Sequence, residues 1–280
     1  MKKVFLTALA LIAFSVSVVT AQEIKMPQAS TTQTIEQNFG LGKIKVNYSR
    51  PNVKGRKVFG GLVPYNEVWR TGANSSTIVT FSEDVELEGN KVAAGEYALF
   101  TIPTQNEWTI ILNKDTKQWG AYTYKQNEDV LRFKVKSQKL KDKVETFTIQ
   151  FGQVYPTTAS MSLAWENTSV AINLKTEIDS KVMASIDEAM KGDKKPYFQA
   201  AQYYFENGKD LNKALEWVNE AEKQDNKAPW VKLWKSRIQL KTGDKQGAAV
   251  TAEAGIKAAK EANIEEYIRL NTQALAEAKK

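Results

Sequence analysis

The residues best suited to chemistry lie close together in residues 49–74, which have the sequence SRPNVKGRKVFGGLVPYNEVWRTGAN. This segment mixes arginine and lysine with large aromatic side chains, and glycine and proline interrupt it. Guanidinium groups clamp carboxylates and phosphates, while aromatic faces stack on planar or sugar rings. Connections of this length that lack regular structure are often functional. The segment therefore predicts an anion or sugar site.

Seven residues make up this predicted ligand site. They are Arg50, Arg56, Trp69, Arg70 and Asn74 from the segment itself, with Trp119 and Tyr122 from the downstream QWGAY sequence. A structural role competes with the binding role, because large aromatic side chains in β modules are mostly core and arginine also pairs with acids. From residue types alone the structural role is the more common one, so both alternatives stay open.

The chain contains no His and no Cys, which excludes several kinds of catalysis. Ser-His-Asp triads, Cys-His pairs, His-ligated zinc and thiol redox chemistry all need one of these residues. Carboxylate pairs, Ser-Lys arrangements and oxygen-ligated cations such as calcium remain possible. The carboxylates available to a glycan hydrolase include Glu67, Glu96, Asp115 and Glu166, but their spacing selects no pair. We therefore assign no catalytic residue, no metal ligand and no cofactor.

The first 21 residues have the pattern of a cleavable secretory signal peptide. Lys2 and Lys3 precede an apolar run over residues 4–19, and small side chains then lead to a predicted cut after Ala21. The run is too short and too close to the N-terminus for a retained transmembrane helix, and without cysteine the product is not a lipoprotein. We expect a periplasmic or secreted protein. Its net charge of +7 is modest, and an exported protein seldom meets nucleic acid, so no such partner is expected.

Residues 22–175 are predicted to form an all-β domain. Ile44, Val46 and Tyr48 alternate with polar residues, as in a strand that buries one face. About nine strands follow from such runs, at 44–48, 77–81, 84–88, 97–102, 108–112, 130–135, 144–151, 160–165 and 170–174. Many short strands without helices between them favour a sandwich or a jelly-roll-like barrel.

Residues 176–280 are predicted to be entirely helical. Apolar residues recur at helical spacing from Ile178 to Ala189, and further helices are expected at 196–207, 211–224, 229–241, 245–261 and 264–278. Small or capping residues repeat after 34 positions, with Asp210 matching Asp244 and Ala214 matching Ala248. This is the tetratricopeptide period, so we expect a tetratricopeptide-like array after the β domain.

Several motifs in the β domain occur together in order. They are the 49–74 segment, AAGEYALFTIP at 93–103, EWTIILNK at 107–114, QWGAYTY at 118–124 and LAWE at 163–166. In these motifs the chain resembles exported bacterial proteins catalogued as domain of unknown function 2911, over about residues 25–175. The resemblance implies a compact exported β module and assigns no activity. The family commonly has an acidic residue after GAN, where this chain has Ser75 and Ser76.

The leading hypothesis is a non-catalytic binding or interaction protein of the periplasm or cell envelope. Its β domain would bind a glycan or small anionic ligand, and its helices would bind a protein partner, since both scaffolds suit binding. One alternative is a carboxylate-dependent glycan hydrolase. Another is a purely structural envelope assembly factor.

Overall fold

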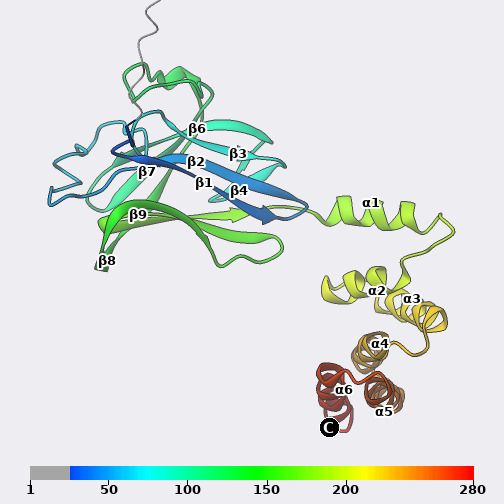
Figure 1. Ribbon diagram of the computed structural model, residues 1–280. Coiled ribbons are helices and arrows are strands. Elements are labelled where there is room, and N and C mark those ends of the chain that lie inside the picture. Colours follow the sequence, from blue (N-terminus) through cyan, green and yellow to red (C-terminus); the bar gives the residue numbers. More distant parts are fainter. Residues whose placement is uncertain (1–25) are drawn as a thin grey trace, which may run out of the picture. The chain divides into compact units, whose positions relative to one another are not determined.

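The computed structural model describes residues 26–280, which divide into two compact units (Figure 1). The first unit ends at Thr176 and the second begins at Glu177. The predicted signal peptide, residues 1–21, lies outside the described residues. Among the helices of residues 26–280, none combines the length and the apolar character needed to cross a membrane.

Within the described residues, the first unit is built on one antiparallel sheet of nine strands. These are β1 (Thr31–Phe39), β2 (Gly42–Arg50), β3 (Thr77–Phe81), β4 (Val85–Leu87), β5 (Asn90–Val92), β6 (Gly95–Pro103), β7 (Glu107–Asn113), β8 (Asp129–Gly152) and β9 (Thr158–Lys175). Their order in the sheet is β1-β2-β3-β6-β7-β8-β9-β4-β5. A short 3-10 helix, Gln126–Glu128, precedes β8. The alternation read from the sequence is observed in β2, where Ile44, Val46 and Tyr48 are buried and Lys43 and Lys45 are exposed.

The predicted strands differ from the observed ones in two ways, because some predicted strands are joined and two observed strands were not expected. Strand β8 joins the predicted ranges 130–135 and 144–151, and β9 joins 160–165 and 170–174. The joining segment of β8, residues 136–143, has no buried residue, so it carries no hydrophobic alternation, yet its residues 137–139 still pair with β9. Strands β1 and β5 are additional. Backbone pairing thus extends strands beyond the hydrophobic core.

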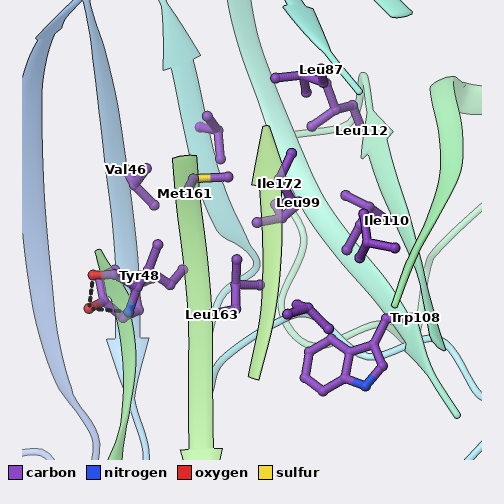
Figure 2. Packing of buried hydrophobic residues seen from close by; sticks show 14 of the residues in the cluster. Val46, Tyr48, Leu87, Leu99, Trp108, Ile110, Leu112, Met161, Leu163 and Ile172 are labelled. Carbon is purple, nitrogen blue, oxygen red and sulfur yellow. Dashed lines mark hydrogen bonds between the residues drawn. The ribbon is translucent and has the colours of Figure 1, made fainter. Parts of the chain in front are cut away.

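The far half of β8 closes the core against β2. The backbone N–H of Ile149 donates to the Tyr48 hydroxyl at 2.9 Å, and Arg50 Nε donates to the Phe147 carbonyl at 3.1 Å. Figure 2 shows side chains of β2, β6 and β7 facing those of Met161 and Leu163 from β9. One large apolar core therefore lies inside this unit, and Ala98, Phe100 and Ile111 form a smaller, separate cluster.

The last strand of the first unit is fixed up to its final residue. Lys175 of β9 pairs with Glu86 of β4. Thr176 is buried, and its backbone N–H donates to the Thr157 carbonyl at 3.0 Å while its hydroxyl bonds to the Asp84 carbonyl at 3.1 Å. The chain therefore leaves the first unit from an anchored position.

Six helices form the part of the second unit that the structure describes. They are α1 (Asp179–Ala189), α2 (Tyr197–Glu206), α3 (Leu211–Gln224), α4 (Pro229–Lys241), α5 (Lys245–Glu261) and α6 (Glu265–Ala278), close to the predicted ranges. Asp210 and Asp244 cap α3 and α5 by accepting hydrogen bonds from backbone N–H groups of the first turn. Ala214 and Ala248 are fully buried, as close helix packing requires.

A half-buried charge cluster links α3 and α4. Glu222 accepts hydrogen bonds from Lys232 and Lys235, each at 2.7 Å. Burial tends to raise the pKa of this carboxyl, but the two lysines outweigh burial and the net pKa is lowered. Both cations therefore share one carboxylate.

Candidate binding pocket

The segment between β2 and β3 is irregular but firmly attached to the sheet. Trp69 and Thr101 of β6 exchange two backbone hydrogen bonds, of 2.8 and 2.9 Å. Nearer the start of the segment, Val53 N–H donates to the Glu145 carbonyl of β8 at 2.8 Å. These bonds hold the segment in a defined position, as a binding site requires.

Trp69 lies in a buried aromatic cluster. Its ring stacks on Trp165 of β9 with centroids 5.8 Å apart, and its edge contacts include Phe59, Trp108 and Phe147. The indole N–H donates to the Gly72 carbonyl at 3.0 Å. Trp69 is 8% exposed, so its large side chain has a core role and only its margin reaches the surface.

The turn after Trp69 has a strained backbone. Thr71 has a φ value of +55°, in a region that β-branched residues rarely adopt, and Asn74 has a φ value of +58°. Gly72 has φ +152°, and a Cβ there would lie 2.9 Å from the Ser49 carbonyl oxygen. The Thr71 hydroxyl, fully buried, lies 3.2 Å from that of Thr101. Such strain persists where surrounding bonds over-determine it, and it is often found at functional sites.

A pocket of about 300 Å³ opens beside this turn, and all of its lining residues belong to the first unit. Four predicted site residues line it together, namely Arg56, Trp69, Arg70 and Asn74. Trp165 also lines it, which the sequence analysis missed although LAWE was noted as a motif. No acidic residue is among the lining residues, so the pocket is cationic. We call it the arginine pocket.

The two arginines of the arginine pocket have different surroundings. Arg56 donates from Nε to the Val53 carbonyl at 3.0 Å and from Nη2 to the Asn52 carbonyl at 2.6 Å. Arg70 is half-buried, and its Nε has no hydrogen-bond partner among residues 26–280. An anion is the group that a desolvated, unpaired guanidinium binds best.

Trp119 lies in the loop after β7, beside the same turn. The loop is paired to the turn, since Gly120 N–H donates to the Asn74 carbonyl and Ser76 N–H to the Gln118 carbonyl, each at 2.9 Å. Trp119 is 65% exposed and lines a neighbouring hollow of about 130 Å³ that also includes Asn74. The structure therefore places Trp119 next to the arginine pocket.

Arg50 and Tyr122 are not brought into either hollow. Arg50 is used to join β2 to β8, with Nη2 donating to the Thr148 hydroxyl at 2.8 Å. Tyr122 is 85% exposed and lies against Gly120. A binding role for each of them stays a prediction from the sequence.

The carboxylates considered for hydrolysis do not gather at the pocket. Glu67, Glu96 and Asp115 are exposed, and Glu166 accepts a hydrogen bond from the Val58 backbone N–H at 3.2 Å. None of the four lines the arginine pocket or the hollow beside it. Across the described part of the chain, no group of three or more acidic residues could hold a metal ion.

The comparisons with known proteins give a family and no activity. A family model described as "Protein of unknown function (DUF2911)" matches residues 30–174, which span the nine strands almost completely. No curated protein and no solved structure matches the chain.

Proposed function

Because the chain belongs to the DUF2911 family, whose description gives no activity, we propose a function from the pocket itself. The β unit binds a small anionic ligand and does no chemistry on it. The ligand sits over the aromatic floor of Trp69 and Trp165, with its negative charge at Arg70. This proposal agrees with a chain that has neither imidazole nor thiol groups.

The unpaired Arg70 is the observation that carries the proposal. Its Nε is buried without a partner, and no carboxylate lines the pocket to neutralise it. A half-buried charge without a partner is costly, and the cost is offset when a ligand supplies the opposite charge. Arg56 adds a second positive charge at the same opening.

Binding of this kind depends weakly on the protonation state of the protein. Arginine stays protonated across the usual pH range, and the chain has no His that could change charge near neutrality. The pH dependence of affinity should therefore follow the pKa of the ligand alone. Affinity should also fall with salt, because the pocket is open to solvent at one side.

Calorimetry on the mature chain tests the proposal, with inorganic phosphate, sulfate and glucuronate as probes. We expect at least one probe to bind and to raise the melting temperature, by a stabilisation of about 2.7 kcal/mol at a concentration of 100 times Kd. Arg70→Met should abolish binding, while Lys134→Gln, an exposed cation on β8, should not. Equal affinity in Arg70→Met and wild type would refute the proposal.

The hydrolase alternative has no supporting observation in this geometry, because none of Glu67, Glu96, Asp115 and Glu166 lines the arginine pocket. The assembly-factor alternative makes a different prediction, namely no change in melting temperature with any anion. The calorimetric experiment therefore also separates it from ligand binding.

We also propose a sandwich-like architecture for the β unit and a tetratricopeptide-like one for the helices. The bonds between β2 and the far half of β8 support the first, since they bring two parts of the sheet face to face. The 34-residue spacing of Asp210 and Asp244 as helix caps supports the second. A solved structure would test both descriptions.

The location and the partner of the helices remain proposals as well. We propose export by a signal peptide cut after Ala21, which N-terminal sequencing of the mature protein tests by finding Gln22 first. We propose a protein partner for the helical unit, because helical arrays present extended surfaces. Cross-linking from exposed positions of α2 and α4 in the producing cell should capture it, and a chain that cross-links to nothing would contradict it.

A further inference from the structure

The hollow beside the arginine pocket has a different chemistry. Its lining includes Thr32, Asn47, Ser49, Ser76 and Trp119, and neither an acidic nor a basic residue is among the lining residues. It offers hydroxyl and amide groups around an indole ring. We call it the hydroxyl hollow.

Ser76 points to a missing partner in the hydroxyl hollow. It is 4% exposed, and its hydroxyl has no hydrogen-bond partner among the described residues. Buried hydroxyls are nearly always paired, so an unpaired one that lines a hollow needs an explanation. A hydroxyl group of a ligand could pair with it either as donor or as acceptor.

Trp119 gives the hydroxyl hollow an apolar wall. Its side chain is 65% exposed, although the backbone around it is paired to residues 74–76. An exposed tryptophan on a fixed backbone presents a flat, preorganised surface, and it loses little freedom on binding. A sugar ring has an apolar C–H face and a hydroxyl edge, so it matches an indole ring flanked by hydroxyl and amide groups.

Asn74 joins the two hollows, since it lines both of them. Its side-chain amide lies 3.2 Å from the Ser30 carbonyl, in the lining of the arginine pocket, and 3.3 Å from the Ser49 hydroxyl, in the lining of the hydroxyl hollow. A cationic hollow and a neutral, hydroxyl-lined one are thus separated by one side chain. A ligand that extends past Asn74 would reach both.

We infer that the β unit binds an acidic saccharide, with a sugar ring on Trp119 and Ser76 and the acidic group at Arg70. This inference deepens the proposed function and rests on it, because the arginine pocket must bind the anion. The negative group is a carboxylate or a phosphate carried by the sugar. The hydroxyl hollow supplies the preference for a saccharide over a free anion.

Titration calorimetry on the mature full chain tests the inference with five probes: digalacturonate, glucose 6-phosphate, the neutral parent sugar of each, and inorganic phosphate. We expect at least one of the two acidic sugars to bind ten-fold or more tightly than inorganic phosphate and than its neutral parent. The first two probes distinguish a carboxylate from a phosphate source. If neither acidic sugar is preferred over both references, the inference is overturned.

Variants separate this inference from the proposed function. Trp119→Ala and Ser76→Ala should weaken the acidic sugar about ten-fold and leave phosphate unchanged, and Tyr155→Ala, at an exposed tyrosine outside both hollows, should change neither. Arg70→Met should remove all binding. Unchanged sugar affinity in both Trp119→Ala and Ser76→Ala, with phosphate still bound, sinks the inference alone. Failure of every anion to bind the wild type sinks the proposed function too. Melting curves confirm that each variant is folded.

Discussion

The two units fill their interiors in opposite ways. The core of the β unit contains large aromatic rings, with Trp69 in contact with both Trp108 and Trp165. The helical unit buries many small residues, with Ala214, Ala248 and other alanines fully buried, alongside fewer buried rings such as that of Trp217. Large rings of fixed shape leave gaps at their margins, and the arginine pocket is such a gap. Small side chains instead let helix backbones approach one another closely.

The units also treat half-buried cations differently. In the helical unit, Lys232 and Lys235 share Glu222, so their charges are balanced within the fold. In the β unit, Arg70 Nε is buried without a partner among residues 26–280. The paired cluster serves stability, and the unpaired arginine is available to a ligand. The comparison teaches that charge left unbalanced is the better sign of a binding site.

The largest effect is expected from removing a ring in the β unit. Phe147→Ala deletes a fully buried side chain that contacts Tyr48, Trp69 and Trp165. The cavity should lower the free energy of unfolding by about 3–5 kcal/mol. Hydrogen exchange measured along the chain should show faster opening in residues 26–176 only. An equal change in the helices would mean that the two cores unfold together.

Adding a side chain to the core of the helical unit should lower its free energy of unfolding. Gly255→Ala places a Cβ against the side chain of Asn271, which is fully buried and donates to the Pro229 and Tyr267 carbonyls. We expect overpacking to cost about 1–3 kcal/mol. Ala254→Ser, at an exposed position on the same helix, is the control. The contrast between the cores is contradicted if Gly255→Ala unfolds at the same denaturant concentration as wild type.

The charge cluster should make the helical unit sensitive to acid. The folded-state pKa of Glu222 is lowered, so its stabilisation is present above the unfolded value of about 4.5 and is lost as the pH falls through the folded value. Glu222→Gln should cost about 1–2 kcal/mol at pH 7, since the cluster is partly exposed. The variant should show a smaller loss of stability than wild type below pH 4.5. If the free energy of unfolding changes with pH in the same way in wild type and in Glu222→Gln, Glu222 is not the source of the acid sensitivity.

The smallest effect on stability is expected at Arg70. Arg70→Met removes an unpaired charge and keeps most of the apolar stem, so the free energy of unfolding without ligand should change by less than about 1 kcal/mol or should rise. Arg50→Met is the matched control, because Arg50 bonds to the Phe147 carbonyl and the Thr148 hydroxyl. It should lose about 1–2 kcal/mol. If Arg70→Met loses more free energy of unfolding than Arg50→Met, then Arg70 is the structural arginine of the two, which contradicts the proposal.

The sequence predicts most elements of the fold, because hydrophobic periodicity and turn residues act locally. It does not predict that β8 and β9 are each continuous, since residues 136–143 of β8 bury no side chain, although residues 137–139 pair with β9 through their backbone. Strand β1 is not predicted for a related reason, because most of its residues are partly or fully exposed. Pairing between backbones leaves no mark on the side-chain pattern.

The sequence also predicts four of the residues that line the arginine pocket, namely Arg56, Trp69, Arg70 and Asn74, because they lie in one segment. It does not separate Arg70 from Arg50, because the difference depends on partners in β8, about 100 residues away in the chain. Trp165 and Ser76 are not among the predicted site residues, and the reason is the same. Their roles depend on which atoms remain unpaired after folding.

The anchored end of β9 has a mechanical consequence. Two residues, Glu177 and Ile178, separate Thr176 from the start of α1. Tension on the helices would therefore pass into Thr176 and into a strand that lies between β8 and β4, rather than into a sheet edge. Hydrogen bonds to both neighbouring strands would oppose such a load, so the β unit should resist unravelling from this end of the chain.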